Sequence, residues 1–264
     1  MTARLVCHGG CAPWGTRSIL ACIVVVVLAG TTAAAQRQKI PQAGTPRIAD
    51  GMPDLSAPMP RTVDGKPDLS GIWVLIEPPT GRNRLEMFMA NGARVPAQPW
   101  AEELFQRRNA EFGKGRPSEY CLPHSIPDAM SVRNLPFKIV QTPGLTLILY
   151  EEFNYYRQVF TDGRPHPAAT ELRWFGHSVG QWDKDTFVVE TKGFNDESWL
   201  DDRGRPHTEA LRTMERFQRR DFGHLDVGIT IDDPKAYTAP FSLTMHFQLM
   251  ADTEMLENIC DIRP

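Results

Sequence analysis

The sequence predicts a mainly β protein, in which an antiparallel meander closes into a barrel or a strongly curved sheet with one helix. The first observation behind this prediction is a series of short segments, rich in aromatic and β-branched residues, that fills the chain after Cys121. The second is that the connections between these segments are short and carry Pro, Gly and Asp. The third is that one segment alone, residues 99–112, has clear helix start and stop signals.

The N-terminus has the pattern of a secretory signal peptide over residues 1–35. Arg4 and Arg17 precede an apolar stretch at residues 19–30, and small residues follow at 31–35. The apolar core of about a dozen residues is too short to span a bilayer comfortably and has the length of a signal sequence. We therefore expect cleavage near Ala35/Gln36 and a periplasmic or secreted protein.

Charge and hydropathy exclude some partners. The full chain has a formal net charge of −3, and loss of the two signal-peptide arginines makes it about −5. Without a basic excess, nucleic acid is not an expected partner. No second long apolar run follows the signal, so the mature form is not expected to span a membrane.

Cysteine usage agrees with export. Cys7, Cys11 and Cys22 leave with the signal peptide, and Cys121 and Cys260 remain. In an oxidising compartment the simplest expectation is one disulfide between these two, and the alternative is two buried thiols that never meet.

Residues 36–67 are rich in Pro, Gly and polar residues and are predicted to form an extended arm before a single β-rich domain at 68–264. The arm and the start of the domain share a short echo, GMPDLS at 51–56 and GKPDLS at 65–70. Asp and Ser after Pro are ordinary turn formers, so two similar surface turns are the expectation.

The elements follow in order. The first strand is predicted at residues 71–76, and a loop leads to the helix at 99–112, which we expect outside the barrel or at one end. Pro99 suits the first helical position, and Gly113 supplies the stop. The expected buried stripe of this helix comprises Trp100, Leu104 and Phe105. Later strands are predicted at residues 137–142, 145–152, 155–161, 174–182, 186–191, 211–219, 224–231 and 241–250, with a last short piece at 255–259.

Charged residues also occur inside predicted strands. Strand alternation places Arg157 on one face, while Tyr156 and Phe160 lie on the opposite and more apolar face. The simplest expectation is that Arg157 faces solvent, and a polar lumen would reverse this assignment.

The densest polar cluster, at residues 193–215, supplies the candidate catalytic residues. His207 and Glu209 are two apart, so on a strand they would share a face, with Asp196 or Arg216 as a further partner. Such a pair can act as a general base or as two metal ligands. The alternative is a hydrogen-bonded loop at the barrel mouth.

Other motifs are weaker. The remaining histidines lack the spacing of a metal motif, so no metal site and no cofactor are predicted. Ser178 stands in the string GHSVG, but a predicted hairpin follows it, whereas a nucleophile elbow needs a strand, a sharp turn and a helix.

A resemblance covers nearly all of the mature chain. The string GKPDLSGIW at 65–73, with FTDGRP at 160–165, WDKDT at 182–186 and GFND at 193–196, is similar to a large family of exported, mostly uncharacterised bacterial proteins. The resemblance implies export and carries no catalytic assignment. More weakly, Gly71-Ile72-Trp73 is similar to the Gly-x-Trp of lipocalins, in which the Trp closes one end of the barrel.

Two functions follow from these patterns. The first is a lipocalin-like barrel that binds a small, partly apolar molecule. Its candidate ligand-binding residues are Trp73, Tyr155, Arg157, Trp174 and Trp199. The alternative is an envelope hydrolase, isomerase or lyase that uses the His207 and Glu209 pair. An interaction protein with a long N-terminal arm is a third possibility.

Overall fold

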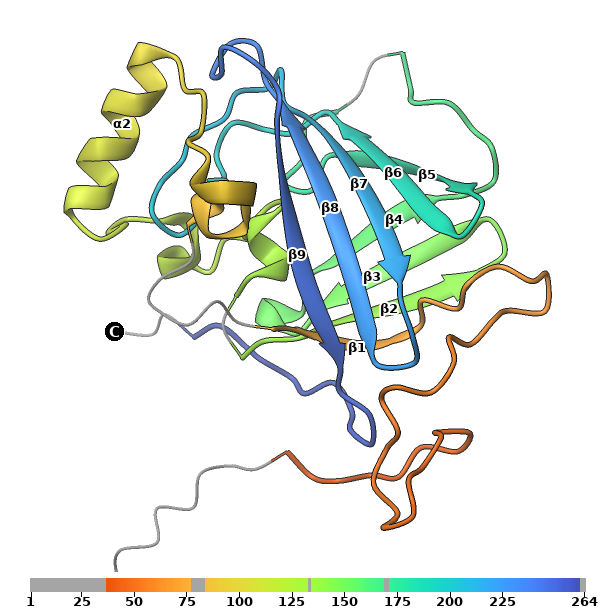
Figure 1. The fold of residues 1–264 in the computed structure, drawn as a ribbon. Helices are drawn as coiled ribbons and strands as arrows, with labels where there is room; N and C mark the ends of the chain where they lie inside the picture. Colours follow the sequence, from red (N-terminus) through yellow and green to blue (C-terminus); the bar gives the residue numbers. More distant parts are fainter. Residues whose placement is uncertain (1–36, 77–83, 133, 169–170, 262–264) are drawn as a thin grey trace, which may run out of the picture. The chain divides into compact units, whose positions relative to one another are not determined.

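The computed structural model describes residues 37–76, 84–132, 134–168 and 171–261, and those from Lys39 onward form one compact unit. The predicted signal peptide at 1–35 lies outside the described residues. Within the described residues, nine strands form one closed barrel (Figure 1). The strands are β1 Gly71–Leu75, β2 Phe137–Thr142, β3 Leu145–Tyr150, β4 Tyr156–Phe160, β5 His177–Asp183, β6 Thr186–Lys192, β7 Arg212–Arg219, β8 His224–Asp232 and β9 Phe241–Leu249. The predicted β-barrel is therefore confirmed.

Each strand pairs with the next along the chain, and β9 returns to β1. All neighbours are antiparallel except β4 and β5, which are parallel. A closed ring of nine strands cannot alternate direction throughout, so at least one parallel pair is required. The long connection at 161–176 provides it, because a chain that returns in the same direction needs more than a hairpin turn. The expected purely antiparallel meander is wrong at this one seam, and residues 255–259 do not form a strand.

The barrel interior is filled largely by alternate side chains of the strands, most regularly in β7, β8 and β9. In β9, for example, every second residue from Phe241 to Leu249 is buried while those between are exposed. Arg157 also belongs to this interior: it is 2% exposed, whereas Tyr156 is 62% exposed. The expected solvent-facing orientation of Arg157 is wrong, because a buried carboxylate from β7, Glu215, compensates its charge inside the barrel.

Trp73 of β1 occupies the interior without exposure. Its indole N–H donates to the Leu69 carbonyl at 2.9 Å, and the Arg219 guanidinium lies 5.0 Å from its ring centroid. Gly71 has a φ of 141°, and a Cβ there would meet Leu249 Cδ1 at 2.5 Å. Glycine is favoured at this position because the positive φ strains any other residue, and a Cβ would also displace the Leu249 side chain.

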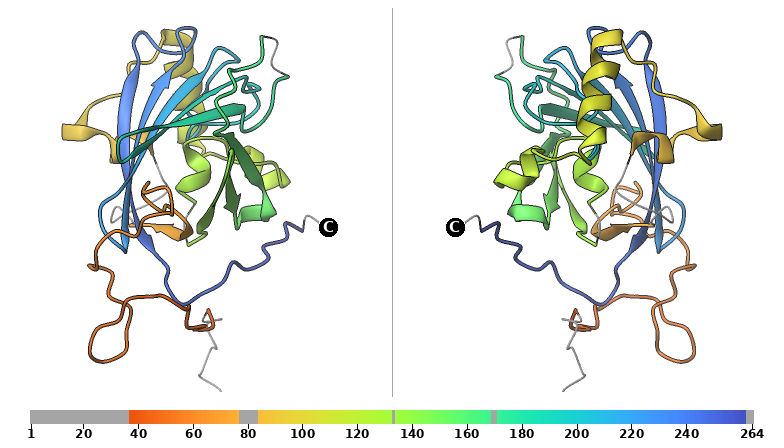
Figure 2. Two further views of the ribbon diagram at one scale, coloured as in Figure 1. Left: turned by 90° about the vertical axis from the view of Figure 1, so that its right-hand side faces the viewer. Right: turned by 90° about the vertical axis from the view of Figure 1, so that its left-hand side faces the viewer.

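The helix α2, Pro99–Ala110, is the one α-helix in the described residues and lies outside the barrel wall (Figures 1 and 2). Ala101 and Phe105 form its buried contacts. Trp100, expected in the buried stripe, is instead 43% exposed and donates from Nε1 to the Lys235 carbonyl. Within the described ranges, every helix is too short or too polar to traverse a bilayer.

The two copies of the echo adopt the same turn. Ile48 and Thr62 each donate their amide to the carbonyl four residues later, at 3.0 and 2.9 Å. The residue directly before Ile48, and likewise before Thr62, is an arginine. Its two terminal guanidinium nitrogens bind the carboxylate of an aspartate in a turn next to a barrel strand. These pairs are Arg47 with Asp252 and Arg61 with Asp185. The echo is therefore a repeated clamp that ties the arm to two barrel turns.

The predicted disulfide between Cys121 and Cys260 is present, with a Cα–Cα distance of 5.6 Å. It joins the C-terminal tail to the segment that precedes β2. The tail is also held by a hydrogen bond from the Leu256 amide to a Glu151 carboxylate oxygen, at 2.9 Å. The described part of the tail contributes no strand to the barrel, so these contacts fix it in place.

Candidate functional site

A pocket of about 260 Å³ lies at the parallel seam of the barrel. The strands β4 and β5 pair only at Val159–Ser178 and Phe160–Val179, and the chain that precedes β5 contributes residues 173–176 to the pocket. Aromatic side chains dominate its lining. They are Tyr155, Tyr156, Phe160, Trp174, Phe175 and His177.

The walls of this pocket are held by specific contacts. The Tyr155 hydroxyl donates to the Cys121 carbonyl at 2.9 Å. Phe175 stacks on Tyr150, with ring centroids 5.1 Å apart and planes within 4° of parallel. The Trp174 carbonyl accepts a hydrogen bond from Ser125 Oγ at 2.6 Å. These contacts fix the walls of the pocket to neighbouring segments of the chain.

Behind the pocket, the Arg157 side chain lies at the centre of a cluster of polar side chains in the barrel interior. Its guanidinium pairs with the Glu215 carboxylate, and it donates to Ser178 Oγ at 2.9 Å and Thr191 Oγ1 at 2.6 Å. Nearby, burial raises the pKa of Tyr150 to about 12, so this phenol stays neutral. All three guanidinium nitrogens are used within the protein, which indicates a structural role for the Arg157 head group.

A histidine pair lies at the edge of the pocket. The Nδ1 atoms of His166 and His177 are 3.4 Å apart, and Glu190 Oε2 lies 3.4 Å from His166 Nε2. Burial lowers the pKa of both imidazoles, and for His177 the neighbouring His166 adds to this effect. The pair therefore favours the neutral form, in which one imidazole can donate a hydrogen bond to the other.

Three of the five predicted ligand-binding residues meet at this pocket, namely Tyr155, Arg157 and Trp174. The other two lie elsewhere. Trp73 is enclosed in the barrel interior, and Trp199 packs beneath Arg108 of α2, whose guanidinium is 4.2 Å from its ring centroid. The structure therefore brings together the aromatic residues around β4 and separates them from these two tryptophans.

The four predicted catalytic residues do not converge. His207 is buried, with Nε2 2.7 Å from Ser198 Oγ and Nδ1 3.2 Å from the Thr208 carbonyl. Glu209 and Asp196 are exposed, and Arg216 lies on the outer face of β7. There it pairs with Asp183 at 3.0 Å. The same-face argument for His207 and Glu209 fails because residues 207–209 do not form a strand and Glu209 lies in a turn.

The structure instead reveals a cluster with no motif in the sequence. His124 Nδ1 is 2.5 Å from Glu152 Oε2, and His124 Nε2 is 3.2 Å from Asp202 Oδ1 and 3.5 Å from Asp128 Oδ2. Burial lowers the pKa of His124, but the three carboxylates outweigh this and raise it well above its usual value. Burial raises the pKa of Asp128 well above its usual range, against the opposing charge of His124.

Three separate segments position this histidine–carboxylate cluster, which comprises His124, Asp128, Glu152 and Asp202. His124 and Asp128 precede β2, Glu152 lies between β3 and β4, and Asp202 lies between β6 and β7. The backbone next to Glu152 is unusual, since Phe153 has a φ of 52°, a conformation rare for an aromatic residue. The cluster could not be found by motif spacing because its members lie on three segments that are distant in sequence and meet only in the folded chain.

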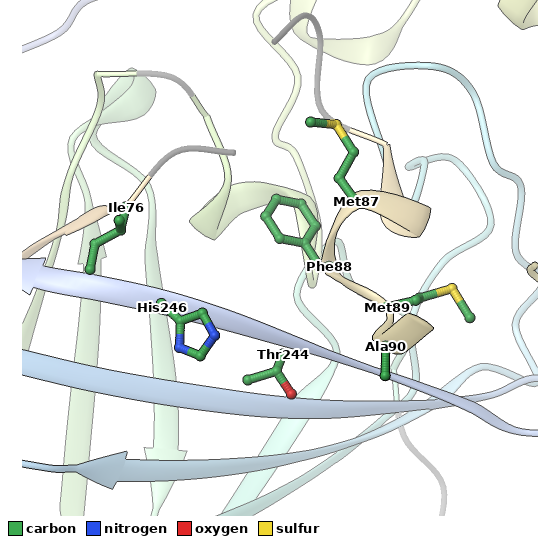
Figure 3. Close-up of a pocket in the computed structure, with 7 residues that line it drawn as sticks. All are labelled: Ile76, Met87, Phe88, Met89, Ala90, Thr244 and His246. Atoms are coloured by element: carbon green, nitrogen blue, oxygen red, sulfur yellow. The ribbon is translucent and has the colours of Figure 1, made fainter. Parts of the chain in front are cut away.

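A second depression, of about 600 Å³, lies on the outer face of β9 (Figure 3). Thr244 and His246 of β9 face Met87 and Phe88 of a short 3-10 turn and Met89, which follows it. Ile76 also lines this groove, to which we assign no function.

Comparison with known proteins gives no identification. The chain matches no protein-family model, and no curated protein sequence is significantly similar to it.

Proposed function

We propose that this chain is an exported, lipocalin-like barrel that binds a small, partly apolar molecule in the aromatic pocket at the β4–β5 seam. The observation that carries the proposal is the convergence of Tyr155, Tyr156 and Trp174, with other aromatic side chains, on one pocket. Export rests on the signal pattern at residues 1–35 and agrees with the Cys121–Cys260 disulfide. Membership of the exported bacterial family with the PDLSGIW opening is part of the same proposal.

The pocket limits the ligand. Its volume of about 260 Å³ is just below the range for drug-sized ligands, so a compact molecule is expected. Flat aromatic walls favour an apolar body, while the Tyr155 hydroxyl, His177 and Arg173 offer polar contacts at the rim. The alternative, an enzyme that uses His207, Glu209, Asp196 and Arg216, loses support because these side chains point to different places.

Ligand-observed NMR with a panel of small aromatic fragments tests this proposal. Binding should be lost in the Trp174→Ala and Tyr156→Ala variants, both of which remove pocket walls. The matched control is Trp100→Ala, which removes an exposed tryptophan from α2 and should bind as the wild type does. Fragments that bind equally well to all three variants, or to none of the proteins including the wild type, would overturn the proposal.

A further inference from the structure

The histidine–carboxylate cluster lies outside the proposed ligand pocket and has the arrangement of a metal site. Candidate ligand atoms from His124, Asp128 and Asp202 all lie within 4.8 Å of one another. His124 uses its two ring nitrogens differently: Nδ1 contacts Glu152, and Nε2 faces the two aspartates. In metal proteins, a ligating histidine typically donates its other ring N–H to a carboxylate, which fixes the ring and its tautomer.

A second observation concerns Asp128, which is 2% exposed. Its Oδ1 accepts a hydrogen bond from Ser131 Oγ at 3.0 Å. Its Oδ2 is buried, points toward His124 and accepts no hydrogen bond in the described part of the chain. A buried carboxylate oxygen without a donor is costly, and a bound cation would remove this cost.

We propose that His124 Nε2, Asp128 Oδ2 and Asp202 Oδ1 bind one divalent transition-metal ion of the Zn²⁺ class, with Glu152 as the carboxylate that orients His124. Tetrahedral ligands at Zn²⁺ distances are separated by about 3.4 Å. The Nε2 atom lies 3.2 and 3.5 Å from the two aspartate oxygens, and all three atoms lie within 4.8 Å of one another, so two of the three separations match those around such an ion.

The donor set decides the class of ion. One imidazole nitrogen with two carboxylate oxygens suits Zn²⁺, Mn²⁺ or Fe²⁺ better than Mg²⁺, which prefers oxygen ligands and retains its waters. The Asp202 side chain is 28% exposed and gives the site access to solvent. Asp202 Oδ1 also lies 3.4 Å from Arg116 Nε, so the arginine competes with the ion for this carboxylate.

Isothermal titration of Zn²⁺ into the chelator-treated protein gives the first test. We expect one equivalent to bind, with loss of binding in Asp128→Asn and His124→Gln. The Glu152→Gln variant should bind about 10–100-fold more weakly, as orienting carboxylates do. Arg116→Gln should bind more tightly, because it removes the competing charge. The control is His246→Gln, from an exposed His–Asp pair in which Nδ1 is 2.6 Å from Asp226 Oδ1, and it should bind normally.

X-ray absorption of the Zn²⁺-loaded wild type gives a second test that needs no variant to fold. We expect the Zn²⁺ coordination shell to contain one imidazole, with oxygen atoms as the other ligands. A shell with two imidazoles would place the ion at His166 and His177 and overturn the proposal. The absence of Zn²⁺ binding, or unchanged binding in a folded Asp128→Asn variant, would also overturn it. Zn²⁺ binding should persist in Trp174→Ala, which separates this site from the ligand pocket.

Discussion

The two sides of the barrel differ in how they are built. On one side, β7 and β8 pair without a break from Arg212 to Arg219, and β8 and β9 continue the ladder. On the other, β4 and β5 pair at only two positions. The interior of β8 and β9 is apolar, whereas the interior next to β4 holds Arg157 and its polar partners. The long ladders supply the stable wall, and the short seam leaves room for polar groups and a pocket.

This difference has a physical cause. A continuous ladder satisfies every backbone group and leaves only side-chain packing inside, so it offers few places for a ligand. Where a parallel pair must be inserted, the ladder is short and the adjoining loops complete the wall. The pocket and the histidine–carboxylate cluster both involve loops next to β4, including the segment that carries Pro123 and His124. The seam is therefore the region where substitutions should reveal function rather than packing alone.

The largest effect should come from breaking the interior ion pair. Glu215→Ala leaves the Arg157 charge buried without a partner, and we expect a loss of about 3–5 kcal/mol in the free energy of unfolding. Urea denaturation measures this loss of unfolding free energy. The double variant Arg157→Met/Glu215→Leu should recover most of the loss, because a well-packed apolar pair replaces the charges. Arg216→Ala, which removes an exposed ion pair from the same strand, should change stability by about 0–1 kcal/mol. Equal losses of unfolding free energy in Glu215→Ala and Arg216→Ala would contradict a buried ion pair between Arg157 and Glu215.

The disulfide is expected to contribute next. Reduction, or a Cys121→Ser/Cys260→Ser variant, should lower the free energy of unfolding by about 2–5 kcal/mol, because the link closes a long loop in the unfolded chain. Denaturation with and without reductant measures this loss. Intact-mass analysis of the alkylated protein should show two protected thiols before reduction. Two free thiols in the unreduced protein would refute the bond.

Much of the fold could be predicted because strand alternation and turn residues are local signals. The orientation of Arg157 could not, since it depends on Glu215, which is distant in sequence but adjacent in the barrel. The parallel pairing of β4 and β5 could not be predicted either, because it follows from the total number of strands in the closed barrel, which no single segment reveals. The candidate site was partly predicted: aromatic residues near β4 were found, while His124 and its carboxylates were missed because they lie in three different loops. His207 shows the opposite error, in which a polar-rich loop concealed a buried hydrogen-bonded histidine.

A smaller effect should appear in the pH dependence of stability. Burial lowers the pKa of His207, so the folded state holds the neutral imidazole while the unfolded state takes up a proton below about pH 6.5. Stability from this group is therefore present above pH 6.5 and is lost as the pH falls toward the folded pKa, by at most about 1.4 kcal/mol per pH unit. As the pH is lowered from 7.5 to 5, the denaturation midpoint should fall less steeply in His207→Gln than in the wild type. Parallel curves for the two proteins would show that His207 is not held neutral.

The smallest effect concerns the repeated clamps of the arm, which contact the two sides of the barrel separately. Arg61 binds Asp185 in the turn between β5 and β6, whereas Arg47 binds Asp252 after β9. Both clamps are exposed, so their loss should loosen a turn locally without unfolding the barrel. In Arg61→Ala, hydrogen exchange should accelerate at the Thr62 amide and stay unchanged at its counterpart, Ile48. Because the two turns share one hydrogen-bond pattern, the second copy is an internal control. Equal acceleration in both turns would mean that the arm is held as one unit rather than by two independent clamps.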